Sequence, residues 1–406
     1  MSGIYVHIPF CKKKCGYCDF YSIRLCKDSD LLSKYFDALT TEIVNKSYLF
    51  KNQTVETIYF GGGTPSIVPF NYLEKVYKSI SDNYHLANNI ECTLEINPEQ
   101  ATDQYFSELK ASGFVNRLST GFQSMDNDCL KFLGRCHTVD DNYRYLDLCQ
   151  KYGFDNFSVD YIFGYELLTL NEIERSFKIF IDLKIPHISA YSLGIEQGTP
   201  FYLKLRKGEI NVINDDDYVQ QYRLVHNLLT SVGYEHYEIS NYSLPEKYSK
   251  HNTNYWNFVP YLGFGASAHS YYNNIRSWNI RDVRKYCDMV SRGEMSFEQE
   301  QLSKTDQFNE FIMLSLRTHR GIDLNHLYND FPEYENEFLR NCKNKKISRY
   351  LVEDNGFMRL NLDGVMISDS IISELFAKRR VNNTSLQLFD YHLIFNVTSV
   401  VTSRFL

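Results

Sequence analysis

Six short segments with β-strand patterns alternate with amphipathic helical patterns along the first half of the chain. The predicted strands cover residues 4–8, 57–60, 91–96, 117–120, 157–162 and 187–191. The clearest helical pattern covers residues 30–46, where apolar side chains recur at i, i+3 and i+4. Repeated strand–helix alternation implies a parallel sheet with right-handed crossovers. We therefore predict an α/β fold, a partial (β/α)6 barrel, with an eight-stranded barrel or a doubly wound sheet as alternatives.

Polar residues recur where these predicted strands end. In parallel barrels the functional side chains gather at the carboxyl ends of the strands. The residues concerned are the cysteines after the first strand, residues 61–65 after the second, Glu95 and residues 97–99 at the third, Gln123 after the fourth and Asp160 inside the fifth. Each alone is more simply a turn residue or a satisfied core group. Together with Arg135, which can pair with a carboxylate, they indicate a ligand that carries an amine, a carboxylate and a ribose.

Three cysteines follow the first predicted strand in the run CKKKCGYC, at Cys11, Cys15 and Cys18. Soft thiolates select zinc, copper(I) or iron–sulfur clusters, and protein-held sites usually take four ligands. Three thiolates therefore indicate a metal centre with one open coordination position. A structural zinc site is the alternative, and its fourth ligand would be His7, Asp19 or Cys26. We do not expect a disulfide, because no segment resembles a signal peptide.

Bulk composition limits the partners of the chain. Among 406 residues 43% are hydrophobic, and no apolar run approaches the 18 or so residues of a membrane span. The net charge of −7 argues against a broad nucleic-acid surface. We therefore expect a cytoplasmic protein that binds no nucleic acid.

The motifs resemble those of the radical S-adenosylmethionine (SAM) superfamily. The resemblance rests on CxxxCxxC with Tyr17 before the last cysteine, on YVHIPFC, GGGTP and LSTGFQS, and it covers about residues 4–374. It implies that the three cysteines hold a [4Fe–4S] cluster whose fourth iron binds SAM. It further implies SAM contacts from Tyr5, Tyr17, Gly62, Gly63, Thr64, Glu95, Gln123, Arg135, Asp160, Gly194 and His269.

Within this superfamily the chain looks most like the group of oxygen-independent coproporphyrinogen III oxidases and HemW heme chaperones. The oxidases have a fourth cysteine where this chain has Phe20, and an N-terminal extension where only ten residues precede Cys11. The run from His251 to Trp256, HNTNYW, fits the HNxxYW signature of HemW. A neutral imidazole is a good axial ligand for heme iron, and Tyr255 and Trp256 offer flat apolar contact.

These features predict a chaperone that binds heme and transfers it to an acceptor protein, which can be membrane-bound. On residue types alone, the simpler interpretation is that His251 caps the backbone and that Tyr255 and Trp256 pack in the core. The resemblance to the family favours heme binding by these residues instead. The alternative function is a radical SAM oxidoreductase that acts on a tetrapyrrole, as coproporphyrinogen III oxidase does. Whether the protein is an enzyme stays open. A homodimer is implied by resemblance only.

The strand–helix alternation stops near residue 299. Beyond it the patterns predict helices at 308–318, at 333–349 and from 368, with a strand at 356–360. We divide the chain into a radical SAM barrel with the heme-binding segment (1–299), a smaller, mostly helical domain with a β-wing (300–377), which resembles the C-terminal domain of the group, and a tail of unknown role (378–406).

Overall fold

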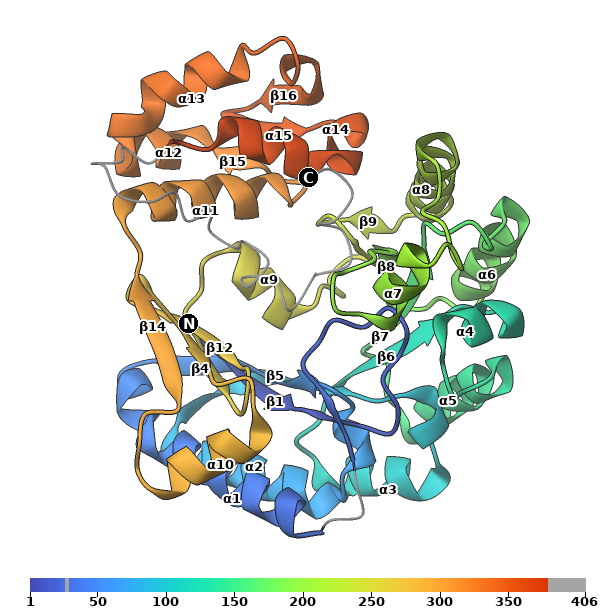
Figure 1. Cartoon of the computed structure of the whole chain (residues 1–406), viewed down its shortest axis with the longest axis vertical. Helices are drawn as coiled ribbons and strands as arrows, with labels where there is room; N and C mark the ends of the chain where they lie inside the picture. The colour runs from blue at the N-terminus through green and yellow to red at the C-terminus, as the bar shows by residue number, and fades with distance from the viewer. Residues whose placement is uncertain (26–28, 379–406) are drawn as a thin grey trace.

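The protein was analysed as a computed structural model that describes residues 1–25 and 29–378, so Cys26 and residues 379–406 of the tail lie outside the described residues. Six parallel strands form the centre of a curved 12-stranded sheet (Figure 1). They are β1 (Ser2–Ile8), β4 (Thr54–Gly62), β5 (His85–Glu95), β6 (Arg117–Gln123), β7 (Phe157–Phe163) and β8 (His187–Ser192), in that spatial order. All six predicted strands are present, each one extended at one or both ends.

Additional strands lengthen the sheet at both sides. Beside β1 lies β11 (Tyr261–Phe264), which is also parallel, followed by antiparallel β12 (His269–Tyr272), β13 (Ile275–Asn279) and β14 (Phe297–Gln301). Beside β8 lie antiparallel β10 (Asn241–Ser243) and β9 (Glu235–His236). Within the described residues β9 and β14 are the two unpaired edges. The barrel is therefore partial, as predicted.

Helices surround the convex side of the sheet in an arc (Figure 1). They include α1 (Ser29–Asn45), α2 (Phe70–Asn83), α3 (Asp103–Ser112), α5 (Val139–Tyr152), α6 (Leu170–Asp182) and α8 (Asp215–Thr230). Helix α6 illustrates why they form: a Thr169–Glu172 capping box starts it, and Ile173, Phe177 and Phe180 bury one face. The opposite, concave side of the sheet holds the polar cavity described below.

Successive residues along a strand point alternately to the convex and to the concave side of the sheet. All of Arg117 to Phe122 except Gly121 are buried on β6, but only Arg117 and Ser119 of these line the interior cavity, whereas Leu118, Thr120 and Phe122 do not. Because neighbouring strands are in register, their inward-facing residues form layers across the sheet. The interior of this barrel is consequently polar, with charged and hydroxyl side chains where many barrels have aliphatic ones.

The open side of the arc is filled by helix α9 (Lys250–Trp256) and by the C-terminal region (Figure 1). That region contains α11 (Lys304–Leu316), α12 (Leu324–Asp330), α13 (Glu335–Cys342), α14 (Leu362–Met366) and α15 (Ser368–Leu375), with a small sheet of β15 (Ile322–Asp323), β17 (Phe357–Leu360) and β16 (Leu351–Asp354). It has its own hydrophobic cluster, and Trp256 of α9 belongs to that cluster. The helical region with a β-wing is as predicted, although α13 is shorter than the predicted segment at 333–349.

Two sets of contacts join this region to the sheet. Arg276 of β13 and Glu310 of α11 form a buried two-pronged ion pair, with Nε–Oε1 at 2.6 Å and Nη2–Oε2 at 2.7 Å. Near β10, the backbone N–H of Ile239 donates to Arg317 O at 2.9 Å, and the N–H of His319 donates to Tyr237 O at 3.1 Å. No helix among the described residues combines the length and the apolar character that a membrane crossing requires.

Candidate cluster and ligand site

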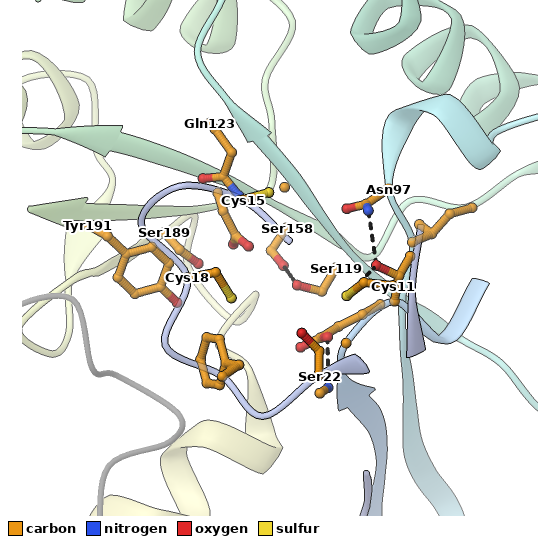
Figure 2. A pocket seen from close by; sticks show the side chains of 18 of the residues that line it. Cys11, Cys15, Cys18, Ser22, Asn97, Ser119, Gln123, Ser158, Ser189 and Tyr191 are labelled. Carbon is orange, nitrogen blue, oxygen red and sulfur yellow. Dashed lines mark hydrogen bonds between the residues drawn. The ribbon is translucent and has the colours of Figure 1, made fainter. Parts of the chain in front are cut away.

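A polar cavity of about 190 Å³ lies on the concave side of the sheet, against the cysteine loop (Figure 2). Nine of the eleven residues expected to contact SAM line it: Tyr5, Tyr17, Gly62, Gly63, Thr64, Glu95, Gln123, Arg135 and Asp160. The three cysteines also line it, as do His251 and Tyr255 from α9 and Phe20. Residues from the start to the middle of the chain therefore converge on one site, which also meets the segment predicted to bind heme.

The cysteine loop connects β2 (Phe10–Cys11) to β3 (Ile23–Arg24) and is held at its middle by two helices. The N–H of Gly16 donates to Leu133 O, at the end of α4 (Asn127–Leu133), at 3.3 Å. The N–H of Phe201, in α7 (Pro200–Arg206), donates to Gly16 O at 2.8 Å. A Cβ on Gly16 would lie 2.3 Å from the Phe201 ring, so glycine is required there. These contacts fix the loop over the strand ends.

The cysteine sulfurs are spaced too widely for a single metal ion. A zinc ion with Zn–S bonds of about 2.3 Å brings its sulfurs to within about 4 Å of one another. The three sulfurs here do not all lie within 4.8 Å of one another. Burial, followed by the neighbouring Cys15 and Cys11, raises the pKa of the Cys18 thiol to about 12. A thiol with such a raised pKa becomes a thiolate only when a positive metal centre compensates its negative charge. The wide spacing of the three sulfurs fits a cluster of several irons.

The other candidates for a fourth zinc ligand do not complete a site in the described residues. Both ring nitrogens of His7 are engaged, Nδ1 with the Tyr5 hydroxyl at 3.0 Å and Nε2 with Tyr21 O at 2.9 Å. Asp19 does not line the cavity, and Cys26 lies outside the described residues. A cluster with an open position for SAM thus fits the three cysteines better than a zinc site.

The glycine run after β4 is packed against the strand that leads to the cysteines. A Cβ on Gly63 would lie 2.6 Å from Phe10 O and 2.9 Å from Ile8 O. The N–H of Gly63 donates to Ile8 O, and that of Thr64 to Phe10 O. Gly63 is therefore required by the close approach of two backbones, and its expected contact with SAM stays a prediction. The Gly62 N–H donates to Glu95 Oε2 at 3.2 Å, inside the protein.

Two buried carboxylates face the cavity from β5 and β7. Glu95 accepts a hydrogen bond from the Tyr59 hydroxyl at 2.9 Å, and burial raises its pKa to about 7. Burial also raises the pKa of Asp160 to about 6, against the effects of the Ser189 hydroxyl and of Arg117 and Arg135. Raised carboxyl pKa values in a cavity are typical of sites that receive a cationic or hydrogen-bonding ligand. The amine and the ribose hydroxyls of SAM are such groups.

The Glu95 pKa predicts a specific pH dependence of stability. Below the ordinary pKa of 4.5 the carboxyl is protonated in both states, and above about 7 it is ionised in both, where burial of the charge costs stability. The free energy of unfolding should therefore fall, relative to Glu95→Gln, as the pH rises from about 5 to about 8, by at most about 3 kcal/mol. Urea denaturation of the ligand-free proteins across this range measures the difference. Parallel curves for the two proteins would contradict the prediction.

Arg135 and Gln123 complete the site next to the cysteines. The Arg135 guanidinium donates to Asn97 Oδ1 at 2.8 Å and to Gly121 O at 3.0 Å, and its Nη1 lies 3.5 Å from Cys15 Sγ. Gln123 has a left-handed backbone with φ of 63°, and its buried Oε1 has no partner. Backbone strain and an unsatisfied polar atom in a cavity are features of ligand sites.

The segment predicted to bind heme is divided between two environments. His251 is 2% exposed; its Nδ1 pairs with Thr57 Oγ1 at 2.8 Å and its Nε2 with the Tyr255 hydroxyl at 2.9 Å. Burial, together with Arg117, lowers the pKa of His251 to about 3, so the imidazole is neutral at physiological pH. Trp256 points into the C-terminal hydrophobic cluster and does not line the cavity.

Three predicted site residues do not reach the cavity, and several unpredicted ones do. Besides Trp256, these are Gly194 and His269; the ring of His269 stacks on that of Trp278. Their assignments stay predictions. Unpredicted lining residues include Arg117, Ser119, Ser158, His187, Ser189 and Tyr191 (Figure 2 labels four of them). Their alternation with apolar residues along β6, β7 and β8 was the signal that would have revealed them.

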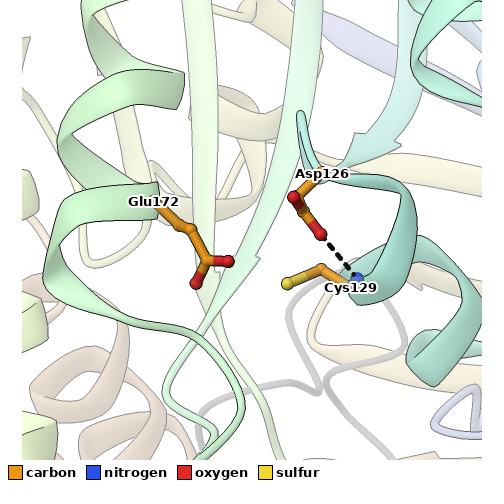
Figure 3. Close-up of side chains that lie close together, drawn as sticks. All are labelled: Asp126, Cys129 and Glu172. Carbon is orange, nitrogen blue, oxygen red and sulfur yellow. Dashed lines mark hydrogen bonds between the residues drawn. The ribbon is translucent and has the colours of Figure 1, made fainter.

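A second group of potential metal ligands lies elsewhere, at Asp126, Cys129 and Glu172 (Figure 3). Asp126 accepts from the N–H groups of Asp128 and Cys129 at the start of α4. Glu172 accepts from the N–H and hydroxyl of Thr169 at the start of α6. Both carboxylates thus act as helix caps, which explains the group without a metal.

Comparison with known proteins agrees with this geometry. A model of the radical SAM superfamily matches residues 5–180, and a model of the HemN C-terminal domain matches residues 302–367. The chain is 34% identical over 330 residues to the heme chaperone HemW of Lactococcus lactis subsp. lactis, which covers 81% of this chain and 85% of that protein. The chain belongs to the HemW family. HemW of Bacillus subtilis is 32% identical over 324 residues, which cover 79% of this chain and 85% of that protein.

The family lies within the radical SAM superfamily, which implies SAM and a [4Fe–4S] cluster as cofactors. Among solved structures, coproporphyrinogen III oxidase (HemN) of Escherichia coli matches 93% of this chain and 90% of its own, with a TM-score of 0.79 and 20% sequence identity. This likeness establishes a shared fold, including the C-terminal region. HemW relatives, at 30% identity and above, resemble this chain more closely in sequence than the oxidase does.

Proposed function

We propose that the protein is a heme chaperone that binds heme beside a SAM-linked [4Fe–4S] cluster and transfers it to an acceptor protein. The observation that carries the proposal is the convergence on one cavity of the three cysteines, the carboxylates and His251. The family membership supports it, because the named relatives are heme chaperones. Phe20, at the position where the oxidases have a fourth cysteine, lines the same cavity and supports it against coproporphyrinogen oxidation.

In this proposal Cys11, Cys15 and Cys18 hold the cluster, and the cluster supplies one-electron chemistry to bound SAM. Arg135, next to Cys15, would meet the SAM carboxylate, and Glu95 and Asp160 would meet its amine and ribose. The neutral imidazole of His251 is the form that ligates iron. To bind iron, its Nε2 would exchange the hydrogen bond to Tyr255 for the metal.

We also propose that the chain divides near residue 299 into a barrel and a C-terminal domain. The separate hydrophobic cluster of the C-terminal region supports this division. Trp256 is an exception to this division. Helix α9 lies before residue 299 in the sequence, but its Trp256 packs into the hydrophobic cluster of the C-terminal region. Helix α9 therefore carries the predicted heme ligand, His251, near its start and contacts the C-terminal cluster through Trp256 at its end.

Heme titration tests the proposed function directly. After anaerobic reconstitution, the wild type should bind stoichiometric heme, and His251→Ala should bind it at least roughly 100-fold more weakly, the upper end of what loss of an outer-shell partner of a metal site costs. Absorbance in the Soret region measures both affinities. Tyr255→Phe, which frees Nε2 but keeps the ring, should retain heme binding.

A matched control separates loss of a ligand from loss of folding. His236 is also partly buried, stacks on Tyr242 and does not line the cavity, so His236→Ala should bind heme like the wild type. A wild type that binds no heme would refute the chaperone proposal. Conversion of coproporphyrinogen III to protoporphyrinogen IX by the same sample would establish the oxidoreductase instead.

A further inference from the structure

Arg117 is a buried cation that forms no ion pair with any described carboxylate. Its side chain is 1% exposed, and its Nε has no hydrogen-bond partner. Within the described residues it forms no ion pair, whereas the other strongly buried arginine pairs, Arg276–Glu310 and Arg317–Asp369, are closed at 2.6 Å. A guanidinium does not release its proton in proteins, so this charge cannot neutralise itself. An unpaired buried charge is unfavourable, and a bound anion would offset that cost.

Two other buried polar atoms near Arg117 also have no hydrogen-bond partner among the described residues. Its neighbour in register on β5 is Thr93, whose buried Oγ1 has no partner. His187, on β8, also lines the cavity, and its buried Nδ1 has no partner. Neither Glu95 nor Asp160 forms an ion pair with Arg117 in the described residues, although the Arg117 charge lowers the Asp160 pKa against the larger effect of burial. The polar groups around Arg117 thus keep hydrogen-bonding capacity that a bound ligand could use.

We infer that Arg117 binds a carboxylate of the tetrapyrrole, a heme propionate, at the inner end of the cavity. This inference rests on the proposed function and names the part of the ligand that reaches Arg117. Both Arg117 and His251 line the cavity, and each lies close enough to the other that the Arg117 charge helps to lower the His251 pKa. One ligand with an iron and two carboxylates can therefore use both residues.

The carboxylate of SAM does not fit this role. Arg135 already stands beside the cysteine loop and contacts Gly121 O, on the same strand as Arg117. Gly121 and Arg117 are four residues apart on β6, which is about 13 Å along a strand. A carboxylate held at the cluster by Arg135 is therefore too distant for Arg117. SAM carries no second anionic group.

Esterification of the propionates tests the inference. The full-length wild type should bind heme at least about 30-fold more tightly than heme dimethyl ester, because the ester cannot form the charge pair. In Arg117→Met the affinity for heme should fall to that for the ester, so that this preference disappears. The His251→Ala variant should still bind iron-free protoporphyrin IX more tightly than protoporphyrin IX dimethyl ester, because His251 is needed only to bind the iron.

The stability of the ligand-free variant provides a second measurement. A buried unpaired charge replaced by an apolar side chain of similar size is expected to leave the thermal midpoint of Arg117→Met unchanged or higher. If Arg117→Met melts lower and keeps the wild-type preference for heme over the ester, Arg117 only balances Glu95 and Asp160 and the inference is wrong. A loss of SAM affinity with unchanged heme preference would place the anion on SAM and would also overturn it.

The two proposals fail in different ways. If the wild type binds neither heme nor protoporphyrin IX, the proposed function fails and the inference fails with it. If the wild type binds heme through His251 but Arg117→Met still prefers the diacid, only the inference about Arg117 fails. The inference is supported only if the acid preference is present in the wild type and absent in Arg117→Met.

Discussion

Replacing Cys15 with serine is expected to abolish the iron–sulfur cluster. Cys15 lies in the middle of the loop that α4 and α7 anchor, and its sulfur is 3.5 Å from Arg135 Nη1. With two thiolates left, one of the four irons would lack a protein or SAM ligand. After anaerobic reconstitution, iron and sulfide should fall from about four of each per chain to well under one, and the brown colour should be lost. Iron and sulfide assays and the visible spectrum measure this result.

Cys136 provides the control for that experiment. It is an exposed cysteine one residue after Arg135 that does not line the cavity. Cys136→Ser should therefore keep the full iron content and the colour of the wild type. A Cys15→Ser protein that retained four irons would show that another residue holds the cluster. Cys26, outside the described residues, would then be the next cysteine to replace.

Glu310→Gln should destabilise the protein by about 3–5 kcal/mol, since removal of one partner leaves the other charge buried and uncompensated. The Arg276 and Glu310 side chains are 10% and 4% exposed, and two hydrogen bonds join them. Because this pair links β13 to α11, its loss should release the C-terminal region first. Chemical denaturation followed by fluorescence and circular dichroism measures the change.

Two comparisons make the interpretation of Glu310→Gln specific. Glu337→Gln breaks a more exposed pair with Arg340 at 4.0 Å, and it should change the free energy of unfolding by less than about 1 kcal/mol. The double variant Arg276→Met/Glu310→Leu removes both buried charges and should recover most of the lost stability. If the double variant is no more stable than Glu310→Gln alone, charge burial is not the cause.

The prediction of the fold from sequence succeeded because its signals are local. A period of 3.6 in residues 30–46 and periods near two in the strands depend only on neighbouring residues, and α1 and all six strands lie where those patterns place them. The site was predictable to a similar extent. Once six parallel strands are assigned, their carboxyl ends share one edge, which brings Gly62, Glu95 and Gln123 together with the cysteines.

The structure added information where a residue's environment depends on distant chain segments. Gly63 is glycine because β1 and β2 pass 2.6 Å from where its Cβ would lie. Trp256 is one residue from Tyr255, yet it packs into a cluster made of residues beyond 300. Neither result follows from local pattern, because each depends on how two far-separated segments meet.

By itself, the sequence determined the strand–helix alternation, the three-cysteine loop and the family to which the chain belongs. Only the tertiary structure decided that the cysteine sulfurs stand too far apart for one ion, that His251 faces the cavity while Trp256 packs outside it, and that Arg117 is buried with no ion pair among the described residues. The physical reason is that a charge is balanced by whatever lies within a few ångströms of it. For Arg117 those neighbours come from strands far apart in the chain.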